Sequence, residues 1–357
     1  MSAAPQSVLA SVPDRLHAGH VLIVDDSVVA RAVIAQAVDA SDRYAVVGAV
    51  PTVAAALAFL ATTSVDYILL DINLPGVDGI TALPDLIAAG GQARVLIVSS
   101  AAADGAVQTV QALAFGAADT LVKPAAGALS TAFRTALIDK LDRLNAPVHA
   151  PRPALKPTTT PVGWQGGACD LVAIGASTGG IHALSRLLRE LPAAFRTPVL
   201  VTQHLPATFM PYFAAQLALL AGRPCEVATD HLRIRPGRIV VAPGDAHVRV
   251  VPLADDGASI RLSREPSATG CMPSVDVMLA SVAATYGARA TAVVLSGMGR
   301  DGADGARALA QAGGAVVVQD EASSVIWGMP GAVAQQGIAA AVLPPDAIGR
   351  LLVERRR

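Results

Sequence analysis

A serine stands between glycines where an apolar segment, 171–174, gives way to a helical pattern. Gly175, Ser177 and Gly179 have the spacing of a nucleophile elbow, a tight turn between strand and helix that exposes the serine oxygen. The N-terminus of the following helix favours the negative charge that develops when a serine attacks a carbonyl. The same turn could instead cradle a phosphate or simply connect two elements. The pattern predicts acyl-transfer chemistry only if a base and an acid lie nearby.

Two further residues could supply that base and acid. His204 follows the apolar segment 199–203, and Asp301 lies in a glycine-rich turn after a third apolar segment, 291–295. Because the carboxyl ends of parallel strands meet at one sheet edge, we expect Ser177, His204 and Asp301 to lie together there as a catalytic triad. A single histidine is more often structural, so the hypothesis depends on all three residues. Their order along the chain differs from the serine, acid, histidine order of common α/β-hydrolases, which disfavours that class.

A second group of side chains that could react lies where the apolar segments in the N-terminal third of the chain end. Three carboxylates at one sheet edge would repel each other unless a cation lay among them, and Mg²⁺ accepts carboxylates together with phosphate oxygens. A lysine and a hydroxyl could then bind the phosphate. Each residue alone also has a structural interpretation, as a helix cap, a turn residue or a solvated charge. The set comprises Asp25, Asp26, Asp71, Ser99 and Lys123.

The elements that would position these residues form two groups. A length of 357 residues suits two domains, and both halves alternate apolar strand patterns with helical ones, which predicts an α/β fold for each. The segment between the two halves is rich in prolines and threonines, which predicts an extended linker over 144–167. We therefore expect a disordered tail at 1–20 and domains at 21–143 and 168–357. In the second domain, segments around Asp256 and Gly257 predict an added antiparallel hairpin.

Composition excludes several classes of protein. A net charge of −1 and a pI of about 6.6 lack the basic signature of a nucleic-acid binder. Hydrophobic residues reach 53%, but glycine, proline and charged residues interrupt them, so we expect no membrane span. The first twenty residues do not have the pattern of a signal peptide. The three cysteines are widely spaced, which argues against a disulfide framework or a zinc site and favours the cytoplasm.

The N-terminal segments resemble the receiver domain of two-component response regulators over about 21–143. The resemblance is carried by 21–27, 70–79, 98–100 and the pair Lys123-Pro124. It implies a flavodoxin-like, five-stranded parallel sheet and phosphorylation of Asp71 by a histidine kinase. It further implies that Mg²⁺ is held by Asp26, Asp71 and the Asn73 carbonyl, with Asp25 assisting through water, and that Ser99 and Lys123 form the switch. Thr120 departs from the aromatic residue that many receivers carry at this place.

The whole chain from about residue 21 resembles chemotaxis protein-glutamate methylesterases, which are response regulators that remove methyl groups from chemoreceptors. Besides the triad segments, 242–244, 273–276 and 323–330 carry the resemblance. It implies a doubly wound α/β catalytic domain that needs no cofactor. The implied roles are nucleophile for Ser177, base for His204, orienting acid for Asp301, oxyanion donor for the Met298 amide and support for Thr178. Gly331 and 270–272 depart from the pattern of relatives.

The resemblance implies a cytoplasmic enzyme that meets the membrane only through its receptors. It would hydrolyse glutamate γ-methyl esters on receptor helices, release methanol and deamidate receptor glutamines. We expect the unphosphorylated receiver to pack over the Ser177 edge, and phosphorylation of Asp71 to weaken that contact. Two rival functions are a DNA-binding output domain, which the charge balance opposes, and a regulatory binding module, which the intact triad opposes.

Overall fold

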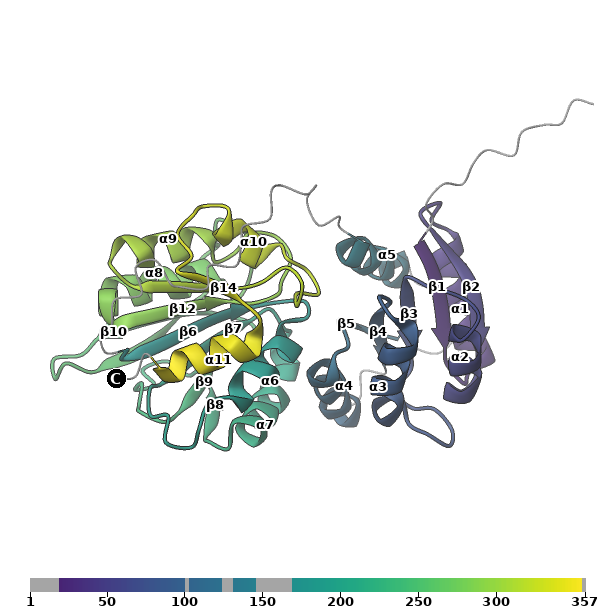
Figure 1. Ribbon diagram of the computed structural model, residues 1–357, viewed down its shortest axis with the longest axis horizontal. Coiled ribbons are helices and arrows are strands. Elements are labelled where there is room, and N and C mark those ends of the chain that lie inside the picture. The colour runs from purple at the N-terminus through teal and green to yellow at the C-terminus, as the bar shows by residue number, and fades with distance from the viewer. Residues whose placement is uncertain (1–18, 100–102, 124–130, 146–168, 355–357) are drawn as a thin grey trace, which may run out of the picture.

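The structure is a computed structural model, and it describes residues 19–99, 103–123, 131–145 and 169–354. Two open α/β sheets form separate domains (Figure 1). The predicted linker, apart from its first residues, and Pro124 lie outside the described residues, as does most of the predicted tail. None of the described helices combines the length and apolar character needed to cross a bilayer.

The N-terminal sheet has five parallel strands in the order β2-β1-β3-β4-β5, which confirms the flavodoxin-like prediction. Buried residues of α1 and α5 pack on one face of the sheet, and those of α2, α3 and α4 pack on the other. The elements are β1 Gly19–Val24, α1 Val28–Asp39, β2 Tyr44–Val50, α2 Val53–Leu60, β3 Tyr67–Leu70, α3 Gly79–Gly90, β4 Arg94–Ser99, α4 Ala103–Phe115, β5 Asp119–Val122 and α5 Thr131–Asn145.

The ends of this domain differ slightly from the predicted boundaries. The first strand begins at Gly19, so His20 belongs to the sheet and not to a tail ending at residue 20. The last helix continues to Asn145, past the predicted end at 143. In both cases backbone pairing or helical hydrogen bonding extends beyond the strongly patterned apolar residues, which are all that periodicity detects.

The C-terminal sheet has seven strands, all parallel, in the order β14-β13-β12-β6-β7-β9-β8. The predicted antiparallel hairpin, β10-β11, forms its own two-stranded sheet beside α8. The elements are β6 Leu171–Ala176, α6 Gly180–Arg189, β7 Val199–Gln203, η1 Ala207–Phe209, α7 Met210–Ala221, β8 Cys225–Val227, β9 Ile239–Val241, β10 His247–Pro252, β11 Ala258–Ser263, α8 Val275–Tyr286, η2 Gly287–Arg289, β12 Ala290–Val294, α9 Ala303–Gln311, β13 Ala315–Gln319, α10 Met329–Ala334, β14 Ala341–Leu343 and α11 Pro345–Glu354.

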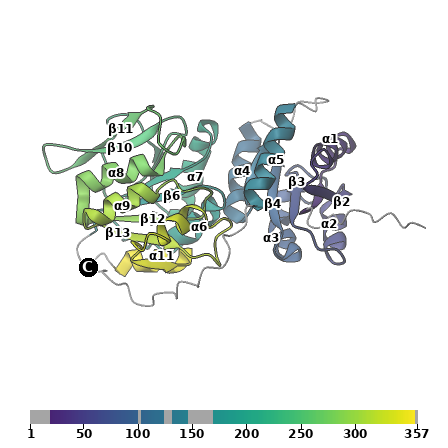
Figure 2. The same ribbon diagram turned by 90° about the horizontal axis from the view of Figure 1, so that it is seen from above.

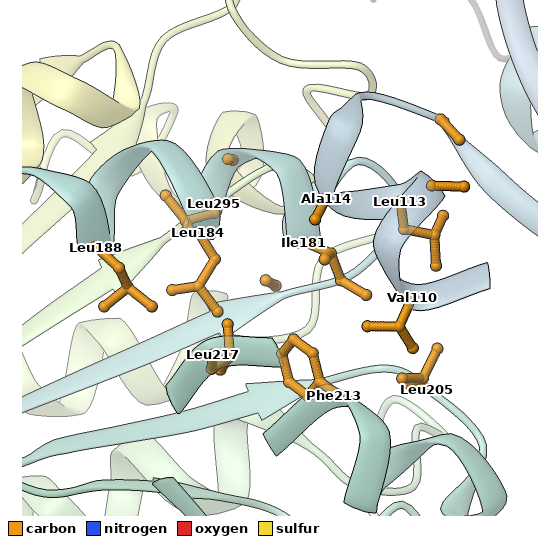
Figure 3. Packing of buried hydrophobic residues seen from close by; sticks show 14 of the residues in the cluster. Val110, Leu113, Ala114, Ile181, Leu184, Leu188, Leu205, Phe213, Leu217 and Leu295 are labelled. Atoms are coloured by element: carbon orange, nitrogen blue, oxygen red, sulfur yellow. The ribbon is translucent and has the colours of Figure 1, made fainter. Parts of the chain in front are cut away.

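Helix α4 of the first domain packs against α6 and α7 of the second (Figure 2). Figure 3 shows Val110 and Leu113 of α4 close to Ile181, Leu205 and Phe213. All five side chains are almost completely removed from water. Burial of apolar surface therefore holds the two domains together in this arrangement.

Candidate functional site

The serine turn directly follows β6. The Ser177 N–H donates to the Ser296 carbonyl at 3.0 Å, and the Gln203 side-chain amide donates to the Ser177 carbonyl at 2.9 Å. Gly179 has φ +74°, and a Cβ at this position would lie 2.5 Å from Val325 Cβ. Only glycine fits this conformation and this space. The turn is therefore fixed through its backbone, and no described residue hydrogen-bonds to the Ser177 hydroxyl.

The histidine and the aspartate form a direct pair. His204 Nε2 lies 2.9 Å from Asp301 Oδ2, and the His204 backbone N–H donates to the Ala176 carbonyl at 3.1 Å. Because Nε2 faces Asp301, Nδ1 is the ring nitrogen left to serve as a base. Ser177 and His204 line one cavity, and no hydrogen bond joins their side chains in the described structure. The predicted triad residues thus meet at one sheet edge, with the histidine–aspartate half of the triad already hydrogen-bonded.

Five groups direct hydrogen bonds at the Asp301 carboxylate, which is 1% exposed. Besides His204 they are the hydroxyls of Thr269 and Ser274 and the backbone N–H groups of Val275 and Asp276. The last two belong to the first turn of α8, where N–H groups lack helical partners and favour an anion. Burial raises the pKa of Asp301, but the hydrogen bonds from His204 and Val275 outweigh it and lower the pKa to about 2.

Thr269 and Ser274 were not predicted as site residues. Ser274 also caps α8, accepting from the Val277 N–H at 3.4 Å. The sequence signal for it was an N-cap serine before an apolar helical pattern, which predicts a helix start but no contact with a residue 27 positions away. Thr269 lies in an irregular segment, and no sequence pattern indicated a contact with Asp301.

Asp276 adds a second carboxylate behind Asp301. Its side chain accepts from the Gly305 N–H at 2.7 Å. Burial raises the pKa of Asp276, the Gly305 hydrogen bond opposes this, and the negative charge of Asp301 raises it further, to about 6. One carboxylate is therefore held ionised while its neighbour is pushed towards the protonated form.

Met298 and Thr178, predicted as oxyanion donor and supporting residue, flank the serine turn. Both line the cavity that contains Ser177. A Cβ on the neighbouring Gly297 would lie 2.8 Å from Ser177 Cβ, so the two backbones approach closely here. No described residue accepts a hydrogen bond from the Met298 N–H, which leaves this group available to a ligand. The Thr178 hydroxyl lies 3.5 Å from Asp119 Oδ2 of the N-terminal domain.

The N-terminal domain forms one wall of the catalytic cavity. The cavity has a volume of about 910 Å³, and residues from α4, β5 and α5 line it opposite Ser177 and His204. The Gly179 N–H donates to the Ala118 carbonyl at 3.1 Å, and His182 Nδ1 lies 3.0 Å from the Ala114 carbonyl. The first domain thus contacts the serine turn itself and forms part of the cavity wall beside it.

The predicted acidic cluster lies at the carboxyl edge of the N-terminal sheet. Oxygen atoms of Asp25, Asp26 and Asp71 lie within 4.8 Å of one another. Lys123 Nζ is 2.6 Å from Asp71 Oδ2 and 2.8 Å from Asp25 Oδ2. Burial raises the pKa of Asp71, and the Lys123 hydrogen bond and charge only partly oppose the increase. The Lys123 pKa is lowered by burial but raised on balance by hydrogen bonds to Asp25 and Asp71.

The donor set of this cluster fits a magnesium ion. Hard carboxylate oxygens are the ligands that Mg²⁺ prefers, and Asp26 is exposed, so an ion could enter from solvent. The Asn73 N–H donates to Asp71 Oδ1 at 3.3 Å, which places the Asn73 backbone beside the carboxylate.

Ser99, the predicted switch hydroxyl, hydrogen-bonds to α4. Its Oγ lies 3.0 Å from Thr109 Oγ1, and the Thr109 hydroxyl donates to the Gly105 carbonyl at 2.6 Å. Since the Thr109 proton is used there, Ser99 is the donor of the first bond. Thr120, the departure from the receiver pattern, has a buried hydroxyl oxygen without a hydrogen-bond partner among the described residues.

Comparison with known proteins agrees with both halves of this description. Residues 172–352 match the family model for CheB methylesterase, and residues 21–134 match that for the response regulator receiver domain. The chain is 42% identical over 346 residues to protein-glutamate methylesterase/protein-glutamine glutaminase 2 of Caulobacter vibrioides, covering 94% of this chain and 99% of that one. It is 38% identical over 360 residues to the protein-glutamate methylesterase/protein-glutamine glutaminase of Azospirillum brasilense, covering 92% and 90%.

A solved structure resembles the C-terminal half. The CheB methylesterase catalytic domain of Thermotoga maritima is 33% identical, with a TM-score of 0.51, and the match covers 53% of this chain and 99% of that one. Together with the relatives that match over nearly the whole chain, this confirms the resemblance on which the sequence analysis relied. The chain belongs to the family of CheB methylesterases that carry a response-regulator receiver domain.

Proposed function

We propose that this chain is a phosphorylation-activated protein-glutamate methylesterase, with Ser177 as its nucleophile. It hydrolyses glutamate γ-methyl esters on chemoreceptors, releases methanol and also deamidates receptor glutamines. The observation that carries the assignment of the site is the His204–Asp301 hydrogen bond, because His204 lines the same cavity as Ser177 at the carboxyl edge of the C-terminal sheet. Family membership supports the choice of substrate.

Acylation begins when the Ser177 oxygen attacks the ester carbonyl. His204 Nδ1 takes the serine proton, and Asp301 holds Nε2–H and stabilises the imidazolium that forms. The free Met298 N–H lies beside the serine turn and can stabilise the negative oxygen of the tetrahedral intermediate. Collapse of that intermediate breaks the bond to methoxide, which leaves as methanol with the proton from His204. An acyl-enzyme on Ser177 remains.

Deacylation repeats these steps with water. His204 removes a proton from the water as it attacks the acyl carbon, and returns the proton to Ser177 as the ester bond breaks. The product is a glutamate side chain. A glutamine amide follows the same route with ammonia in place of methanol, so one site serves both reactions.

The receiver accepts its phosphoryl group at Asp71 from a histidine kinase. An Asp71 oxygen forms a bond to phosphorus while the bond from phosphorus to the histidine nitrogen of the kinase breaks. Asp25, Asp26, Asp71 and the Asn73 carbonyl would hold Mg²⁺, which offsets the negative charge of carboxylates and phosphoryl oxygens. Lys123 can then move from Asp71 Oδ2 to a phosphoryl oxygen, and Ser99 can turn from Thr109 to the same group.

Activation follows from the position of α4. This helix carries Thr109, the partner of Ser99, and one turn further on Leu113, which is buried against the catalytic domain. When Ser99 leaves Thr109, α4 loses a buried hydrogen bond, and its packing on α6 and α7 is weakened. Separation of the domains would then uncover the serine turn. The enzyme would work in the cytoplasm, where it meets the membrane only through its receptors.

Methanol release from methylated chemoreceptor membranes tests the assignment. We expect the wild type to release methanol and Ser177→Ala to release none above background, because the residual catalysis of a triad without its nucleophile is several orders of magnitude slower. Ser185→Ala is a matched control, since that serine is buried in α6 and bonded to the Ile181 carbonyl. Equal release by wild type and Ser177→Ala would contradict the proposal.

A further inference from the structure

A cysteine lies beside the catalytic pair without a role in the reaction. Cys271 precedes α8 and lines the same cavity as Ser177 and His204. Its sulfur, a ring nitrogen of His204 and a carboxylate oxygen of Asp301 lie within 4.8 Å of one another. The thiol donates a weak hydrogen bond to the Thr269 carbonyl at 4.0 Å.

We propose that His204, Cys271 and Asp301 form an inhibitory binding site for Zn²⁺ or a similar borderline-soft divalent cation. Thiolate, imidazole and carboxylate are the three ligand types that Zn²⁺ takes in proteins, and three protein ligands plus water complete its tetrahedral shell. Bonds of about 2.0–2.3 Å put tetrahedral ligand atoms about 3.5 Å apart. The three ligand atoms already lie within 4.8 Å of one another, so only small shifts separate them from that spacing.

The environment of the site is suited to capture of an ion from solvent. The His204 side chain is 18% exposed, and Cys271 is partly exposed on the cavity wall. Asp301 is already committed to the N-terminus of α8, so His204 and Cys271 are the stronger ligands and Asp301 the third. Binding releases the thiol proton to solvent and leaves a thiolate on the metal.

Occupancy would stop catalysis directly. A metal shared with Asp301 would bind Nε2, which leaves the proton of the neutral imidazole on Nδ1, so the nitrogen that serves as base could not accept the proton of Ser177. The ion would also fill space where the ester must lie. The ion is therefore an inhibitor and not a cofactor. Cysteine spacing along the chain gives no sign of such a site, because its three ligands come from three segments that only the fold brings together.

Cobalt binding tests the site without reference to activity. Co²⁺ substitutes for Zn²⁺ and gives a thiolate-to-metal charge-transfer absorption in the near ultraviolet when sulfur is a ligand. The full-length protein is titrated with Co²⁺ in excess Mg²⁺, which occupies the carboxylate cluster of the receiver. We expect the absorption in wild type and in Ser177→Ala, and its loss in Cys271→Ser. Cys225→Ser is the control, because that thiol is half-buried in β8 away from the cavity and should leave the absorption unchanged.

Zinc inhibition of methanol release then tests whether metal binding stops catalysis. This second assay rests on the proposed function. Methanol release is measured against Zn²⁺ concentration, with each variant normalised to its own rate without zinc. We expect micromolar Zn²⁺ to inhibit the wild type, and Cys271→Ser to need at least about tenfold more. An absorption that survives Cys271→Ser, or is absent from wild type, overturns the site. An absorption in a protein that releases no methanol under any condition leaves the site standing and overturns the proposed esterase.

Discussion

Asp71 directly follows a strand of the N-terminal sheet, and Asp301 lies in the loop after a strand of the C-terminal sheet. Both aspartates are buried, but their surroundings differ. Asp71 is 4% exposed and receives hydrogen bonds from Lys123 and the Asn73 N–H, with a second carboxylate, Asp25, nearby. Asp301 is 1% exposed and receives five hydrogen bonds. Burial therefore dominates at Asp71 and raises its pKa, whereas donors dominate at Asp301 and lower its pKa to about 2.

The difference supports the proposal that Asp71 reacts and that Asp301 only supports His204. A carboxylate whose lone pairs are all taken up by donors is a weak nucleophile and a fixed negative charge, which is what a histidine base needs beside it. A carboxylate with few donors and an exposed neighbour keeps an oxygen available for phosphorus and for a metal ion. On the proposed function, the same residue type at the same kind of sheet edge would take opposite roles.

The largest effect is expected from neutralising Asp301. Asp301→Asn keeps the shape but removes the charge that stabilises protonated His204, so kcat for methanol release should fall by about 10⁴-fold with little change in KM. Steady-state kinetics on methylated receptor membranes measures both constants. A decrease of less than about tenfold would mean that Asp301 is not the orienting acid.

A smaller effect is expected from removing one donor to Asp301. Ser274→Ala deletes a hydrogen bond to a buried charge and the cap of α8, so the free energy of unfolding should fall by about 2 kcal/mol. We expect kcat to fall by about tenfold, because the carboxylate is held less firmly. Urea unfolding and methanol release measure the two effects.

Ser281→Ala is the matched control for that variant. Ser281 lies in the same helix and bonds to the Val250 N–H and the Met278 carbonyl, not to Asp301. The Ser281→Ala variant should have a lower free energy of unfolding and an unchanged kcat. An equal loss of kcat in both variants would show that α8 acts only through general stability.

The contact between the domains should limit the unphosphorylated rate. Leu113→Ala removes buried apolar surface where α4 packs on the catalytic domain, so we expect the basal rate to rise by about tenfold and the phosphodonor-stimulated rate to stay the same. Ile34→Ala also truncates a buried aliphatic side chain of the receiver, but in α1, which lines no part of the catalytic cavity, and should leave the basal rate unchanged. A similar rise in both variants would assign the effect to receiver unfolding.

The smallest effect concerns the carboxylate behind Asp301. Because the pKa of Asp276 is raised to about 6 in the folded protein, the native state holds more protons than the unfolded state between about pH 4 and 6. Stability therefore falls as pH rises through this window. Asp276→Asn should remove that fall and be more stable at pH 7 by about 1 kcal/mol, after allowance for solvent screening. Urea unfolding at pH 4.5 and pH 7 compares the two proteins.

The fold and the positions of the main candidate residues were predictable because they depend on local pattern. Ser177, His204 and Asp71 directly follow apolar strands, and parallel strands bring such positions to one edge. Apart from His204, the donors around Asp301 were not predictable, since only tertiary packing brings Thr269 and the helix cap Ser274 to that carboxylate. Packing of the receiver over the Ser177 edge was expected, but the particular contact of Ala118 with Gly179 was not predictable, because it joins two domains across a proline-rich linker.

The central claim is that Asp71 reacts and Asp301 supports, and one experiment measures both roles on the same samples. Wild type, Asp71→Asn and Asp301→Asn are treated with a small phosphodonor and Mg²⁺, and bound phosphate and methanol release are measured together. We predict that Asp301→Asn binds phosphate like wild type but releases almost no methanol, whereas Asp71→Asn binds no phosphate and keeps the unstimulated rate. Phosphate on Asp71→Asn, or near-normal methanol release by Asp301→Asn, would contradict the account.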